Sequence, residues 1–94
     1  MSITESMAKF NLGRLLVTPG ASSLLTTDDV LTALARHLDG DWGDVCEEDR
    51  NSNDEALQCG ARLLSVYHAA NGTKFWIITE WNRSATTILL PQEY

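Results

Sequence analysis

The segment from residue 62 to residue 90 constrains the fold more than any other part of this chain. It contains three short runs rich in β-branched and aromatic residues, Arg62–His68, Lys74–Glu80 and Ala85–Leu90, each bounded by residues typical of turns. The pair Asn71-Gly72 separates the first two runs, and it tolerates the positive φ angles of a tight hairpin. We therefore predict a C-terminal antiparallel meander of three strands.

The middle run, Lys74–Glu80, carries large apolar side chains on both faces of the predicted strand. Phe75 and Ile77 point to one face, whereas Trp76 and Ile78 point to the other, because side chains alternate along a strand. A strand that is apolar on both faces is typical of a covered position inside a sheet. We expect this strand in the interior of the sheet.

The N-terminal half predicts one more strand and two helices. The strand is expected at Arg14–Thr18. An apolar stripe at helical spacing follows a cap at Thr26 or Thr27 and ends at Gly40, which indicates an amphipathic helix. A second, polar helix is predicted from about Cys46 to Cys59. The predicted fold class is α+β: an antiparallel sheet of three or four strands with two helices packed on one face.

The length of the chain, 94 residues, predicts a single domain, in which residues 1–9 are loosely packed. The chain has no apolar run long enough to cross a membrane and no basic region followed by an apolar core at its start, so we expect a cytoplasmic protein without membrane contact. Cys46 and Cys59 lack the spacing of a zinc site and are expected to be reduced thiols. No metal or other cofactor is expected.

The acidic residues are concentrated in one segment. The formal net charge is −6, and eight of the 13 acidic residues lie between residues 39 and 55. They are Asp39, Asp41, Asp44, Glu47, Glu48, Asp49, Asp54 and Glu55. Such a field repels nucleic-acid backbones and favours basic protein surfaces, so the expected partner is a protein with a basic surface. The alternative is an ordinary solvated helix face.

Two tryptophans fall in predicted loops, where large aromatic residues are typical of binding surfaces. Trp42 lies between two glycines, and Trp81 follows the middle strand. The alternative for either residue is that it folds over the small core as a lid. The predicted binding surface consists of Asp39, Asp41, Trp42, Asp44, Glu47, Glu48 and Trp81.

The chain contains no nucleophile elbow, P-loop, dinucleotide fingerprint or zinc-protease motif. One set of residues remains as a candidate catalytic site: His37, Lys74, Arg83, Thr86, Thr87 and Tyr94. These residue types can support metal-independent RNA cleavage, which requires a base for the 2′-hydroxyl, a cation and an acid for the leaving group. The alternatives are that His37 is a favourable cation at a helix end and that Lys74 is a solvated hairpin residue.

The segments Gly40–Asp44 and Trp76–Tyr94 resemble a group of small bacterial plasmid- and phage-related proteins, some of which carry the name "type I restriction endonuclease subunit M". The resemblance extends from residue 12 to the end of the chain and implies a mobile genetic element, without an established activity. Asn82 stands where the group has an acidic residue before the arginine. A methylation subunit requires a cofactor-binding domain with a glycine motif, for which this chain is too short.

Two functions of different classes remain open. The first is a small acidic, non-enzymatic protein-binding module of mobile-element type, such as an inhibitor of a host defence or nucleic-acid-processing complex. The second is a metal-independent endoribonuclease resembling the barnase and RelE type. The negative charge favours the first and argues against direct nucleic-acid binding, because RNA-cleaving proteins hold phosphates in a basic groove. The sequence leaves the oligomeric state open.

Overall fold

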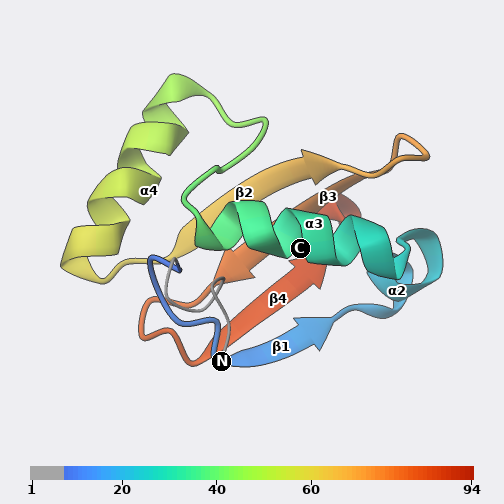
Figure 1. The fold of residues 1–94 in the computed structure, drawn as a ribbon, viewed down its shortest axis with the longest axis horizontal. Helices are drawn as coiled ribbons and strands as arrows, with labels where there is room; N and C mark the ends of the chain where they lie inside the picture. Colours follow the sequence, from blue (N-terminus) through green and yellow to red (C-terminus); the bar gives the residue numbers. More distant parts are fainter. Residues whose placement is uncertain (1–7) are drawn as a thin grey trace.

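The four predicted strands and the two predicted helices occur in the expected order in the computed structural model, which describes residues 8–94, and a further short helix follows the first strand (Figure 1). Residues 1–7 of the segment predicted to be loosely packed lie outside the described residues. The elements are β1 (Arg14–Val17), α2 (Pro19–Leu24), α3 (Thr27–Leu38), α4 (Glu47–Cys59), β2 (Leu63–His68), β3 (Lys74–Thr79), β4 (Ala85–Leu89) and the 3₁₀ turn η1 (Pro91–Glu93). Helices and a single sheet confirm the α+β class.

The four strands form one sheet in the order β1-β4-β3-β2. β2 pairs antiparallel with β3, and β3 pairs antiparallel with β4, so the predicted meander and the interior position of β3 are confirmed. β1 pairs parallel with β4, and the sheet is therefore mixed rather than fully antiparallel as predicted. No local signal indicates this direction, because an alternating pattern is the same in parallel and antiparallel edge strands.

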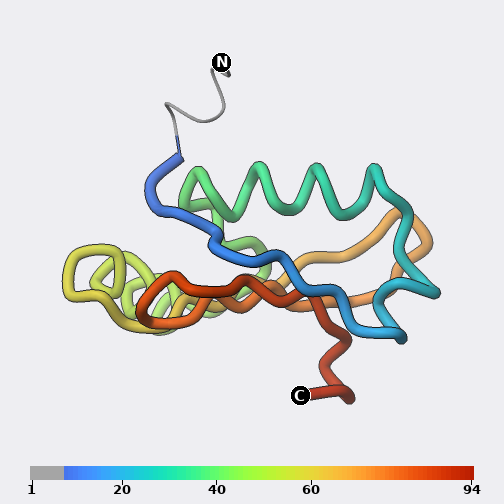
Figure 2. The backbone as a smooth tube through the Cα atoms, turned by 90° about the horizontal axis from the view of Figure 1, so that it is seen from below, coloured from blue at the N-terminus to red at the C-terminus, as the bar shows by residue number. Residues whose placement is uncertain are grey.

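Helix α3 covers one face of the sheet, which we call the front face (Figure 2). Thr26 begins the helix with the predicted cap, since its hydroxyl accepts a hydrogen bond from the Asp29 amide at 3.0 Å. The buried side of α3 is formed by Ala33, Leu34 and His37, which lie over inward-facing strand residues. Not every apolar residue of the helix is buried, since Leu31 is 59% exposed.

The outer edge of β2 is hydrogen-bonded to two segments that precede it in the chain. The Asn53 side chain of α4 donates to the Leu64 carbonyl at 2.7 Å and accepts from the Leu64 amide at 3.2 Å. Two positions further, the Val66 amide donates to the Trp42 carbonyl and the Val66 carbonyl accepts from the Asp44 amide. Unpaired strand edges are prone to association, so these contacts protect the β2 edge of the sheet.

Helix α4 lies beside β2 in the plane of the sheet, rather than over the front face next to α3 (Figures 1 and 2). Its composition explains this position. Only Asn53 and Ala56 of its 13 residues are buried, so the helix has too little apolar surface to cover a sheet face. The prediction of two helices on one face is accurate for α3 only.

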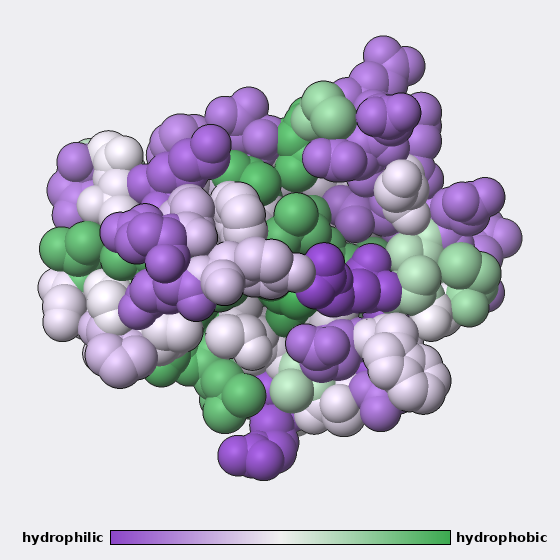
Figure 3. Space-filling view, turned by 180° about the vertical axis from the view of Figure 1, so that it is seen from behind, coloured by the Kyte–Doolittle hydropathy of each residue, from purple (hydrophilic) through white to green (hydrophobic). Residues whose placement is uncertain are grey.

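The opposite face of the sheet, which we call the back face, is covered by the C-terminal residues and not by a helix (Figure 2). The ring of Tyr94 contacts Trp76 edge to face at 5.5 Å between centroids, and the Arg62 guanidinium lies 5.6 Å from the Tyr94 ring. Figure 3 shows the result, with hydrophobic groups visible between polar side chains on this face. The back face is therefore only thinly covered.

We predict that Asn53→Ala destabilises the protein by about 1–3 kcal/mol, because it leaves the half-buried amide and carbonyl of Leu64 without partners. Chemical unfolding monitored by circular dichroism measures this loss. Asn51→Ala is the matched control, since Asn51 lies on the same helix and is exposed. Equal stability of the two variants would show that the side chain of Asn53 does not support the edge of β2.

Candidate functional site

The six residues of the predicted ribonuclease site do not share a cleft. His37, on the sheet-facing side of α3, and Thr86, in β4, are both fully buried. Lys74 is at the hairpin end of β3, five residues, or roughly 17 Å, along the strand from the residue that His37 contacts. Thr87 follows Thr86 in β4 and therefore faces the back of the sheet, where Tyr94 also lies. The hypothesis of a catalytic site at these positions is not supported by the geometry.

Arg83, the remaining member of this set, is engaged in a structural clamp. It adopts a left-handed conformation with φ of 60° in the turn between β3 and β4. Its guanidinium donates to the carbonyls of Ala56 at 3.0 Å, Ala61 at 2.6 Å and Glu80 at 3.1 Å. The planar fork of arginine suits such multiple acceptors, and a cation is favourable at the C-terminal end of α4. Arg83 therefore fastens the turn to the end of that helix.

His37 is the centre of a buried chain of hydrogen bonds. Its Nδ1 lies 2.6 Å from Ser65 Oγ, and its Nε2 lies 2.9 Å from Thr79 Oγ1. Thr79 Oγ1 is 2.8 Å from Thr86 Oγ1, which donates to the Leu12 carbonyl at 2.7 Å. Ser65 and Thr79 were not singled out in the sequence, although each is a hydroxyl at an inward position of an apolar strand.

The direction of these hydrogen bonds places a proton on Nε2 of His37. Thr86 uses its proton on the Leu12 carbonyl, so it accepts from Thr79. Thr79 has then used its own proton, and His37 Nε2 must donate to it. His37 Nδ1 is left to accept from Ser65. Every member of the chain is satisfied when the imidazole is the neutral Nε2–H tautomer.

The surroundings of His37 lower its pKa to about 3, first because burial disfavours the charged imidazolium and second because Arg83 contributes a nearby positive charge. The unfolded chain has an ordinary histidine pKa near 6.5. Below that pH, the imidazole of His37 binds a proton in the unfolded state but not in the folded state. The stability from this residue is therefore complete above about pH 6.5 and is lost as the pH falls towards 3.

We predict that the unfolding free energy falls by about 2 kcal/mol between pH 6.5 and pH 5.0, at about 1.4 kcal/mol per pH unit. Urea unfolding at several pH values measures this. His68→Gln is the comparison, because His68 is the other histidine of the chain, and a slope that persists in this variant arises from His37. Nitrogen chemical shifts should also show His37 as the neutral Nε2–H tautomer at pH 5. A His37 resonance that titrates near pH 6.5 in the folded protein would contradict the assignment.

Trp42 is buried, with 2% of its surface exposed, so the expectation of a solvent-facing aromatic anchor at this position is wrong. Its indole nitrogen donates to Asp54 at 2.9 Å. Its ring contacts the rings of Phe10 and His37, at 6.3 and 5.6 Å between centroids. Trp42 thus packs as a lid between α3, α4 and the N-terminal segment, which is the alternative that the sequence left open.

The glycines on either side of Trp42 turn its loop inward. Gly40 and Gly43 have φ angles of +80° and +78°, a region that other residues rarely adopt. A Cβ at Gly43 would collide with the Val66 carbonyl oxygen. The loop can therefore lie directly against β2, and the indole enters the space under α4.

The acidic residues of the predicted binding surface are all exposed. Two of them have local partners, since Asp41 binds Arg36 at 2.8 Å and Asp44 lies 3.1 Å from His68. The exposed acidic residues whose side chains make no hydrogen bond within residues 8–94 are Asp28, Asp39, Glu47, Glu48, Asp49 and Glu55. Most of these lie on α4, so the free negative charge of this region is concentrated on that helix.

Trp81 is 65% exposed, unlike Trp42. It lies in the turn between β3 and β4, where the Arg83 amide donates to the Glu80 carbonyl at 2.9 Å and the Ser84 amide donates to Asn82 at 3.1 Å. The clamp formed by Arg83 joins the same turn to the end of α4. Trp81 is therefore presented by a braced turn beside the acidic helix.

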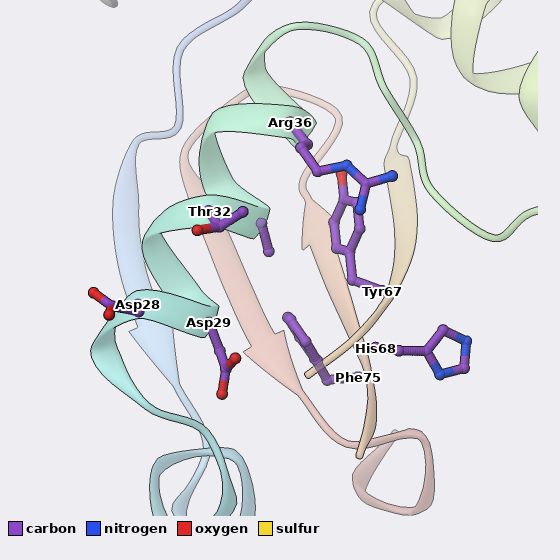
Figure 4. A pocket seen from close by; sticks show the side chains of 8 residues that line it. Asp28, Asp29, Thr32, Arg36, Tyr67, His68 and Phe75 are labelled. Carbon is purple, nitrogen blue, oxygen red and sulfur yellow. The ribbon is translucent and has the colours of Figure 1, made fainter. Parts of the chain in front are cut away.

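A shallow pocket of about 160 Å³ lies between α3 and β2 (Figure 4). Two of its charged lining groups, Asp29 and Arg36, already have partners. Asp29 accepts from the amides of Thr26 and Ala70, and Arg36 lies over the Tyr67 ring while binding Asp41. Figure 4 shows His68 pointing away from the other labelled side chains. No set of free polar groups converges on this pocket, so it offers little to a ligand.

The chain matches no family model, no curated protein and no solved structure. Among residues 8–94, no helix has both the length and the apolar character needed to cross a bilayer. Across the same residues, no group of three or more His, Cys, Asp or Glu side chains is placed to hold a metal ion. Cys46 and Cys59 are free and exposed.

Proposed function

We propose that this protein is a small acidic, non-enzymatic protein-binding module of a mobile genetic element, which inhibits a host defence or nucleic-acid-processing complex by binding a basic surface on it. The exposed Trp81 beside the acidic helix α4 carries the proposal. The resemblance to plasmid- and phage-related proteins supports the mobile-element setting. The dispersal of the six candidate catalytic residues leaves binding as the function that the geometry supports best.

Trp81 has the properties of an anchor residue. A tryptophan buries a large apolar area on binding and is enriched among the residues that dominate interface energetics. The braced turn holds its backbone before the partner arrives, so less conformational freedom is lost on association. We therefore assign to Trp81 alone the role of aromatic anchor that was predicted for both loop tryptophans.

Helix α4 provides the charged part of the proposed surface. Its exposed acids include Glu48 and Glu55, which are seven residues apart and share one side of the helix, with a separation of roughly 10 Å along the axis. Proteins that handle nucleic acids carry basic surfaces for phosphate groups. A row of carboxylates presents a comparable negative charge and would compete for such a surface.

We predict that Trp81→Ala weakens binding to the partner by more than about 2 kcal/mol without lowering the melting temperature. The experiment compares proteins retained from host lysate by tagged wild type, Trp81→Ala and Tyr94→Ala. Tyr94 is the matched control, because it is 67% exposed and lies on the back face. The partner is the protein lost only with Trp81→Ala, and calorimetry with that purified protein gives the affinity. Equal retention by all three proteins would contradict the proposal.

We predict that the double variant Glu48→Lys/Glu55→Lys slows association with that partner by about tenfold at low salt, because charge on a binding surface acts mainly on the association rate. Surface plasmon resonance at several salt concentrations measures the effect. Glu48→Gln/Glu55→Gln removes the charge without reversing it and should give a smaller decrease. An association rate that is independent of both charge and salt would contradict a role for α4.

A further inference from the structure

We propose that the free edge of β1 binds β1 of a second copy of this chain, in an antiparallel register centred on Leu16. Two four-stranded sheets would then join into one sheet of eight strands. The open backbone groups of β1 point away from β4, whereas Trp81 lies in the turn between β3 and β4 and α4 lies beside β2. The proposal therefore does not depend on the proposed function.

The backbone of β1 has one paired and one open side. The amides of Arg14 and Thr18 donate to the β4 segment, to Ser84 and Ile88, at 3.0 Å each. Backbone groups of alternate residues point to opposite sides of a strand, so those of Leu15 and Val17 point away from β4. Among residues 8–94 no other strand lies on that side. The two amides and two carbonyls form a short template for strand addition.

The side chains of β1 are unusually exposed for an apolar strand. Leu15, Leu16 and Val17 are 47%, 40% and 42% exposed, whereas the inward residues of β4 that pair with Leu15 and Val17 are fully buried. On the front face, Val17 and Leu31 line an apolar groove of about 280 Å³ between the strand and the helices. Exposed apolar surface that adjoins open backbone groups is typical of an interface.

The register centred on Leu16 satisfies all the open groups of both copies. It places Leu15 opposite Val17 of the second copy, as a pair that exchanges two hydrogen bonds. The two-fold axis repeats this pair, which gives four hydrogen bonds. On the front face Leu15 then contacts Val17 of the second copy beside the groove, and on the back face the two copies of Leu16 meet.

Charge favours a second copy over an unrelated strand. In the same register Arg14 lies opposite Thr18 of the second copy, on the back face. Within each chain the Thr18 hydroxyl donates to the Glu93 carboxylate at 2.5 Å, so an acid is already held at that position. Arg14 makes no ion pair within residues 8–94. The two-fold axis forms the Arg14–Glu93 contact twice, which makes the edge self-complementary.

Sedimentation of the purified protein over a range of concentrations tests the proposal. We expect a concentration-dependent dimer, and Leu15→Lys/Val17→Lys should weaken it by at least about tenfold, because like charges then lie directly opposite one another. Leu24→Lys is the matched control, since Leu24 is also 47% exposed but lies on α2. Melting temperatures confirm that each variant is folded. A wild-type monomer at all concentrations, or an assembly larger than a dimer, would overturn the proposal.

A second double variant tests the register itself. Leu15→Glu/Val17→Lys places opposite charges across the proposed pair, and it should dimerise at least about tenfold more tightly than Leu15→Lys/Val17→Lys. Equal association of the two variants would overturn the register. Amide exchange of Leu15 and Val17 identifies the occupant of the edge: we expect protection that is lost on dilution. Protection that persists in the monomer would show that the chain covers its own edge and would also overturn the proposal.

Discussion

The buried hydrogen-bond chain through His37 is the interaction on which the rest of the structure depends. It joins α3 to three strands and to the segment before β1, and each group in it has a partner only when all of these segments are in place. A buried polar group without a partner costs more than a satisfied one gains, so the network penalises other arrangements of the same elements. The imidazole of His37 is enclosed and neutral in this network, so it cannot contact a substrate.

Most of the fold follows from local signals in the sequence. The Asn71-Gly72 turn and the apolar faces of β3 depend on neighbouring residues and on alternation, and both identify the meander. The cap at Thr26 is equally local. The direction of β1 and the position of α4 depend on contacts between distant parts of the chain. Asn53 illustrates the difference, since nothing in its neighbourhood indicates that its amide pairs with β2.

The candidate site was harder to predict than the fold, because exposure is a property of the folded molecule. Trp42 and Trp81 both lie near turn residues, yet one is 2% and the other 65% exposed. Trp42 is drawn inward by Asp54, 12 residues away, and by the close approach of Gly43 to β2. The charge pattern was more informative, since acidic side chains in a polar helix are exposed wherever the helix docks.

The two edges of the sheet differ in a way that limits how many molecules can associate. Within residues 8–94, the edge at β2 is occupied by Asn53 and by the loop after α3, whereas the edge at β1 has open backbone groups. A sheet with both edges open can add neighbours without end, which is the geometry of a fibre. A sheet with a single open edge can add only one neighbouring sheet. By occupying the backbone groups of Leu64, Asn53 helps to prevent strand addition at the β2 edge, so association through β1 would end at a pair.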